Sequence, residues 1–143
     1  MFKKINFQFL ISYFGLIPYV LTFLDKYYFL IVEEEDLLHF VTYYSLIIIV
    51  FIGSINWNLK NNPPTHIVVY GFLPSLFAVI IIILSLLNIN LIIIFILIIL
   101  LLLTQLFFDY IILFANESNK QAFNYLRLPL TVLIIIFLFL ISL

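Results

Sequence analysis

Residues 44–57 read YSLIIIVFIGSINW, and this stretch decides the fold. Residues 46–52 form an unbroken apolar run, which is followed by Gly53 and closed by Trp57. Tryptophan side chains concentrate at the membrane–water interface. A glycine in an apolar helix lets the backbone of a second helix approach closely. The stretch therefore predicts a membrane-spanning helix with a packing glycine and an interfacial anchor at Trp57.

The composition of the whole chain agrees with a lipid environment. Of its 143 residues, 66% are hydrophobic and 9% are charged, and the mean hydropathy is +1.32. A soluble domain carries about 25% charged residues. The net charge of −1 excludes nucleic-acid binding driven by phosphate neutralisation. The absence of cysteine excludes disulfides, thiolate metal sites and cysteine nucleophiles.

Five stretches approach the length of about 20 apolar residues that a helix needs to cross a bilayer. Short loops connect them, and no linker or extramembrane domain interrupts the chain. Backbone that faces lipid must be hydrogen-bonded within its own helix. The sequence therefore predicts an all-α membrane protein, a compact bundle of five transmembrane helices in one domain over residues 1–143, with spans at about 7–24, 37–57, 67–87, 91–114 and 126–143.

The basic residues predict the direction of the chain. With five crossings, only Lys26 lies on one side of the membrane, and five basic residues lie on the other: Lys3, Lys4, Lys60, Lys120 and Arg127. Short cytoplasmic loops carry the excess of Lys and Arg. We therefore expect a multi-pass protein of the bacterial inner membrane, with a cytoplasmic N-terminus and a periplasmic C-terminus.

Small residues and prolines within the spans predict helix packing. Small side chains allow close helix contacts, and an internal proline kinks a helix. We expect kinks at Pro18 and Pro74. The predicted packing positions are Gly15, Gly53, Gly71, Ser75, Pro18 and Pro74.

Asp109 is the only carboxylate well inside an apolar run, and such residues are costly in lipid unless they have a partner or a function. The predicted fourth span ends on the side where Arg127 opens the fifth, so the two side chains can meet. Gln105 and Thr131 lie four residues away on the same helix faces. Two interpretations stay open: a structural ion pair between the last two helices, or a proton or substrate site.

The other polar residues point to no chemistry. Residues 33–36, EEED, favour a solvated helix start, and a divalent-cation site there is the alternative. His39 and His66 are expected at membrane interfaces. The sequence contains no nucleophile–base pair, phosphate loop or metal-ligand spacing. We therefore expect no catalytic residue, no cofactor, no metal and no enzymatic activity.

Five segments in chain order resemble one known family. They are residues 15–19, GLIPY; the stretch 44–57; residues 73–76, LPSL; Gln105 with Asp109; and residues 125–131, YLRLPLT. This order resembles domain-of-unknown-function family 3429, small polytopic membrane proteins of proteobacteria with longer mitochondrial relatives. The resemblance implies a membrane protein and no established activity.

Three functions remain open. The first is a non-enzymatic accessory or assembly subunit, whose partners are the lipid bilayer and other membrane-protein subunits. The second is a small transporter or channel formed by oligomerisation, with Gln105, Asp109 and Arg127 along its path. The third is an intramembrane enzyme acting on lipid, for which the sequence offers no catalytic group. A sealed Asp109–Arg127 pair would favour the first function over the second.

Overall fold

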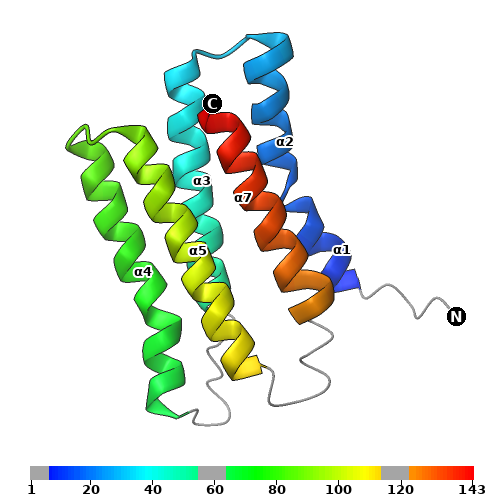
Figure 1. Ribbon diagram of the computed structural model, residues 1–143, viewed down its shortest axis with the longest axis vertical. Coiled ribbons are helices and arrows are strands. Elements are labelled where there is room, and N and C mark those ends of the chain that lie inside the picture. Colours follow the sequence, from blue (N-terminus) through cyan, green and yellow to red (C-terminus); the bar gives the residue numbers. More distant parts are fainter. Residues whose placement is uncertain (1–6, 55–63, 114–122) are drawn as a thin grey trace, which may run out of the picture. The chain divides into compact units, whose positions relative to one another are not determined.

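The computed structural model describes residues 7–54, 64–113 and 123–143, and within these ranges it contains helices and no strand (Figure 1). The predicted all-α class is confirmed for these residues. The helices group into two compact units. We call Met1–Leu37 with Leu106–Leu143 the terminal unit, and Leu38–Gln105 the central unit. The expectation of a single transmembrane domain stays a prediction.

Four helices among the described residues are long and apolar enough to cross a membrane, as expected of a multi-pass membrane protein: Glu34–Ser54, Thr65–Leu86, Leu91–Ile111 and Phe123–Ser142. The elements are α1 Phe7–Phe14, α2 Ile17–Leu24, the π-helix η1 Asp25–Phe29, α3 Glu34–Ser54, α4 Thr65–Leu86, α5 Leu91–Leu113, the π-helix η2 Phe123–Arg127 and α7 Leu128–Ser142.

The predicted first span, 7–24, is not one helix, and this corrects the expectation of five transmembrane helices, since four long apolar helices are found among the described residues. It consists of α1 and α2, eight residues each, separated by a turn at Gly15 and Leu16. Pro18 explains the break, because it has no N–H and its ring would clash with the carbonyl of Phe14 in a continuous helix. Pro18 therefore lies at the start of α2, and Gly15 lies in the turn rather than within a helix.

In the terminal unit, the N-terminal helices run parallel to α7 (Figure 1). The hydroxyl of Tyr13 donates to the carbonyl of Tyr125 (2.7 Å), and the hydroxyl of Tyr27 donates to that of Leu140 (2.7 Å). Tyr13 of α1 thus bonds to η2, and Tyr27 of η1 bonds to the end of α7. Together α1, α2 and η1 extend along nearly the whole length of η2 and α7.

Aromatic side chains fill the interface between these two bonds. Tyr19 is fully buried, and its ring stacks on that of Phe137 with centroids 6.4 Å apart. The ring of Phe23 meets the same Phe137 edge-on at 6.2 Å. Aromatic pairs in these geometries contribute about 0.5–1.5 kcal/mol beyond the area they bury. The broken N-terminal segment is therefore held by α7 and not by its own length.

The central unit is organised by a close crossing of α3 and α4. A Cβ added to Gly53 would lie 2.8 Å from Cγ of Pro74 and 2.9 Å from the carbonyl oxygen of Gly71. The structure thus places Gly53 against Gly71 and Pro74 at this crossing. Pro74 is buried within the continuous helix α4, whereas Ser75 is only half-buried.

Candidate functional site

The structure brings Asp109 and Arg127 together in the terminal unit. Nη2 of Arg127 donates to Oδ2 of Asp109, and the two form an ion pair. The Asp109 side chain is 1% exposed and that of Arg127 is 13% exposed. Asp109 comes from the last turns of α5, and Arg127 is the last residue of η2. This is the pairing that the sequence predicted from the direction of the two spans.

Proline chemistry shapes the segment that presents Arg127. Pro129 follows two residues later and has no N–H, so the carbonyl of Tyr125 has no helical donor at that position. The hydroxyl of Tyr13 supplies the missing hydrogen bond. Phe123, at the start of η2, is buried, and its ring packs edge-on against Tyr110 at 5.7 Å. These contacts fix the turn from which Arg127 reaches Asp109.

The other two members of the predicted cluster lie in different surroundings. Thr131 is buried on α7, one turn after Arg127 and in the same unit. Gln105 belongs to the central unit, where its Nε2 donates to the carbonyl of Ile49 (3.0 Å). Its own carbonyl accepts a hydrogen bond from the hydroxyl of Tyr70 (3.0 Å). Gln105 therefore ties α5 to both α3 and α4.

A second polar group, at the loop between η1 and α3, was missed by sequence reasoning. Lys26 is 11% exposed and forms an ion pair with Glu34 at 2.9 Å. Its Nζ also donates to the carbonyl of Ile141 (2.6 Å), one of the last four carbonyls of α7, which have no partner within the helix. From the sequence, Lys26 was interpreted as a marker of topology and Glu34 as part of a solvated helix start.

Asp25, the residue before Lys26, closes the same loop. Its carboxylate accepts hydrogen bonds from the backbone N–H groups of Ile31 (3.3 Å) and Val32 (3.0 Å). The chain turns at Leu30, which has a positive φ of 52°. An aspartate at the end of an apolar run often bonds to nearby backbone in this way. That tendency is the signal from which the loop could have been predicted.

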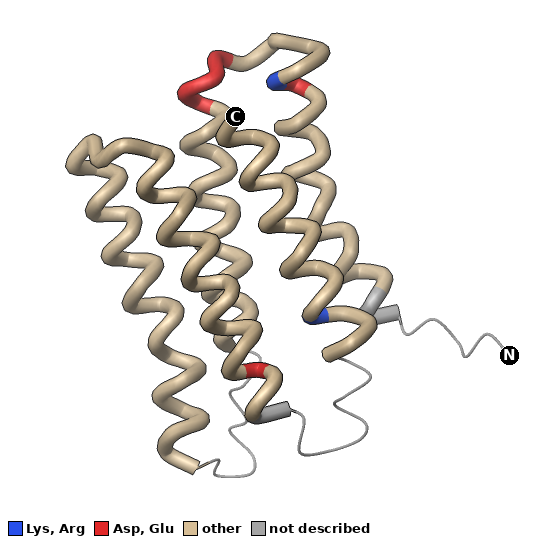
Figure 2. Tube along the Cα trace, in the orientation of Figure 1, with Lys and Arg blue, Asp and Glu red and all other residues tan. Residues whose placement is uncertain are grey.

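Charge is unevenly divided between the two units. Every charged residue that the structure describes belongs to the terminal unit, at the η1–α3 loop or at the Asp109–Arg127 pair. Figure 2 shows these charges at the two ends of the unit, with uncharged helix between them. Within the described ranges, no group of three His, Cys, Asp or Glu side chains could hold a metal ion. Trp57, the predicted interfacial anchor, lies outside the described residues.

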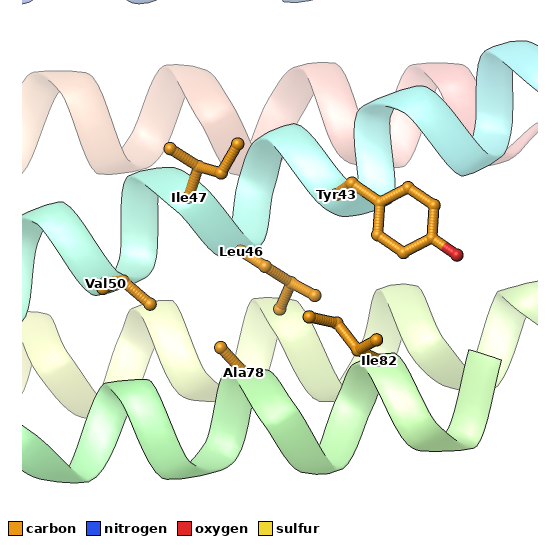
Figure 3. Close-up of a pocket in the computed structure, with 6 residues that line it drawn as sticks. All are labelled: Tyr43, Leu46, Ile47, Val50, Ala78 and Ile82. Atoms are coloured by element: carbon orange, nitrogen blue, oxygen red, sulfur yellow. The ribbon is translucent and has the colours of Figure 1, made fainter. Parts of the chain in front are cut away.

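The central unit contains an open groove between α3 and α4 (Figure 3). Its volume is about 370 Å³, and its lining residues are Tyr43, Leu46, Ile47, Val50, Ala78 and Ile82. Five of these are aliphatic, and the sixth contributes a ring with one hydroxyl. The groove therefore has the character of a surface for apolar groups, and it contains no charge that would hold a polar substrate.

Comparison with known proteins identifies a family and no named relative. No curated protein and no solved structure matches the chain. A family model does match, and it covers residues 6–143, nearly the whole chain. The resemblance noted in the order of the sequence segments is thereby confirmed. The chain belongs to the family described as Protein of unknown function (DUF3429).

Proposed function

We propose that this chain is a non-enzymatic accessory or assembly subunit of a larger complex in the bacterial inner membrane. The observation that carries the proposal is the Asp109–Arg127 ion pair, whose carboxylate is 1% exposed. Asp109 is the side chain best suited to bind a proton or a substrate in the membrane. Here its carboxylate is buried and paired with the guanidinium of Arg127. Separating a buried pair by removing one partner costs about 3–5 kcal/mol. A structural role therefore fits this pair better than a transport site.

The central unit supports the same proposal. Its described part carries no charged residue, and Nε2 of Gln105 is hydrogen-bonded to the backbone of α3. The groove between α3 and α4 is apolar. A solute path needs polar groups to replace the hydration of its cargo. A surface of this kind is better suited to contact with lipid or with helices of other subunits.

The proposal includes five membrane crossings, with the N-terminus in the cytoplasm and the C-terminus in the periplasm. The broken segment α1–α2–η1 runs parallel to α7, and side-chain hydrogen bonds join the two at both ends. Because α7 belongs to a helix long enough to cross, the broken segment covers a similar depth. The first and last crossings of the chain then run in the same direction, as an odd number of crossings requires. Arg127 and Lys26 lie at opposite ends of this pair.

The test is purification of the tagged full-length chain from membranes in a mild detergent, followed by native mass spectrometry. The accessory role predicts a second membrane protein in a fixed ratio, which remains bound through a salt wash. The double variant Asp109→Asn/Arg127→Gln should keep that partner, because it leaves neither charge unpaired. A variant with Leu substituted for Gly53, which alters the packing of α3 on α4, serves as the control for a disturbed fold.

A flux measurement distinguishes the alternative, a small transporter or channel formed by oligomerisation. The purified chain is reconstituted into liposomes, and ion or proton flux is followed with an internal dye. Flux that the wild type supports and the folded double variant lacks, together with a homo-oligomer and no second protein, would replace the accessory role with transport. An isolated monomer without flux would also contradict the accessory role.

A further inference from the structure

The two charged ends of the terminal unit lie close together for a protein that crosses a bilayer. The end opposite Arg127, here called the outer end, carries Lys26. Lys26 donates to the carbonyl of Ile141, so this carbonyl marks the level of the outer end. Residues 127 and 141 are 14 positions apart. At about 1.5 Å per residue this is roughly 21 Å along the helix. The hydrocarbon core of a bilayer is about 30 Å thick.

The outer end has little freedom to move into the hydrocarbon. Asp25, Lys26 and the acidic residues at the start of α3 are gathered there, and charges are costly in lipid. With this end at the membrane surface, the backbone of Arg127 lies roughly 9 Å short of the opposite hydrocarbon boundary. The Asp109–Arg127 pair is therefore expected below the ordinary level of the lipid headgroups.

Of the two paired side chains, that of Arg127 is the more exposed, at 13% against 1% for Asp109. Cα–Cβ bonds in a helix tilt toward the helix N-terminus. Arg127 precedes α7, so its side chain extends back toward the nearby membrane surface. Asp109 lies near the end of α5, so its side chain points back along α5, toward the membrane centre. The two side chains thus meet, and Arg127 is the more accessible of them to a headgroup.

Most of the guanidinium remains available for a second acceptor. Arginine has five N–H donors in a planar fork, and the bond to Asp109 uses Nη2. Within the described part of the chain, Arg127 has no other acceptor. Its side chain is 13% exposed, so part of it reaches the surface of the protein. A phosphate group suits this position, because two of its oxygens can accept parallel N–H bonds from one guanidinium.

We infer that Arg127 binds the phosphate of a phospholipid, which it draws inward toward Asp109. The guanidinium bridges the buried carboxylate on one side and the lipid phosphate on the other. A short hydrophobic length of this kind is accommodated by local thinning of the bilayer and by side chains that reach toward the headgroups. The site requires no partner subunit, so its test is independent of the test of the accessory role.

The test follows thermal unfolding of the full-length chain in neutral detergent while one of two probes is added: dioleoylphosphatidylglycerol or inorganic phosphate. The variant is Arg127→Lys, which keeps the charge beside Asp109 but loses the planar fork. We expect the lipid to raise the unfolding temperature of the wild type, with an apparent affinity about tenfold higher than for the variant. Removal of one of the other basic residues, Lys4→Gln, is the matched control and should leave the affinity within about twofold.

The outcomes separate the sources of phosphate. Stabilisation of the wild type by inorganic phosphate as strongly as by the lipid would overturn the lipid site in favour of a free anion. Equal lipid affinity in wild type and Arg127→Lys would overturn the role of Arg127. If the variant does not fold, the inference can be tested with Arg127 in place, by measuring the depth of a spin label in the membrane. The chain contains no cysteine, so a single introduced cysteine carries the label.

The label is placed at Tyr125→Cys, whose side chain is 68% exposed and whose backbone carbonyl keeps its bond to Tyr13. Its depth is measured by collision with oxygen and with a polar nickel reagent, in bilayers of 14-carbon and 18-carbon lipids. We expect the label at headgroup level in both, because the lipid phosphate follows Arg127 inward. A label that lies at headgroup level in the thin bilayer but in the hydrocarbon of the thick one would overturn the inference.

Discussion

Replacing Gly53 with alanine should weaken the central unit, and the structure sets the size of the effect. The new methyl group would lie 2.8 Å from Cγ of Pro74 and 2.9 Å from the carbonyl oxygen of Gly71. Ordinary contacts begin at 3.4 Å, so α3 and α4 must separate by roughly 0.6 Å, the difference between 3.4 and 2.8 Å. Neither a proline ring nor a helical carbonyl can turn aside as a flexible side chain would.

Two opposing terms determine the free energy of unfolding of this variant. Forcing a methyl group into a tightly packed contact costs about 1–3 kcal/mol. Separating the helices by such a distance also weakens the dispersion contacts along the crossing. Alanine favours a helix by about 1 kcal/mol relative to glycine, which offsets part of this loss. We therefore expect Gly53→Ala to lower the free energy of unfolding by about 1–2 kcal/mol, and Gly53→Leu to lower it further.

The measurement is reversible unfolding in mixed detergent micelles, with sodium dodecyl sulfate as denaturant and circular dichroism as the signal. Ser54→Ala is the matched control, because Ser54 is exposed and, among the described residues, its hydroxyl donates to the carbonyl of Phe51 in its own helix. A change within about 0.5 kcal/mol is expected there. If Gly53→Ala proved as stable as the wild type, α3 and α4 would not cross at this glycine in the folded protein.

Three further predictions concern the charged residues and the topology. Asp109→Asn or Arg127→Gln alone should cost about 3–5 kcal/mol and lower the amount of folded protein in the membrane, whereas the double change should restore much of it; equal abundance in all three variants would contradict the pairing. Lys26→Met should lower the free energy of unfolding by about 1.5–3 kcal/mol, because a charged donor is lost from the end of α7. Glu34→Gln, at a 65% exposed side chain, should cost less than about 1 kcal/mol, and comparable losses in the two variants would assign the effect to the ion pair instead. A reporter that is active only in the periplasm should be active when fused after Leu143, and activity of a cytoplasmic reporter there would exclude five crossings.

The sequence predicted the last two spans and their ion pair for a simple physical reason. A carboxylate inside an apolar run is costly enough to require a partner, and alternating directions of the spans left Arg127 as the nearest cation at that depth. The packing role of Gly53 followed in the same way, since a small residue is useful where another backbone comes close. Such residues are informative because lipid tolerates few alternatives for them.

The first span shows where this reasoning fell short. Residues 7–24 were predicted as one crossing with a kink at Pro18, whereas the structure divides them into two eight-residue helices. Whether such a segment is stable depends on what it packs against. Here the bonds from Tyr13 and Lys26 to carbonyls of η2 and α7 hold it in place. Pro129 and the end of α7 leave these carbonyls without helical donors, but the sequence does not show which distant side chain reaches each of them.

By itself, the sequence determined that the chain lies in the membrane, where its apolar stretches begin and end, and which few polar residues need partners. Only the tertiary structure decided which faces of the helices are buried. Residues 91–103 of α5 are apolar on every face, yet only one side of the helix lies in the core, with Ile94, Phe95, Ile98 and Leu102. In water such a face would be marked by its contrast with polar residues. In lipid that contrast disappears, because the tails are as apolar as leucine, and packing alone selects the side that turns inward.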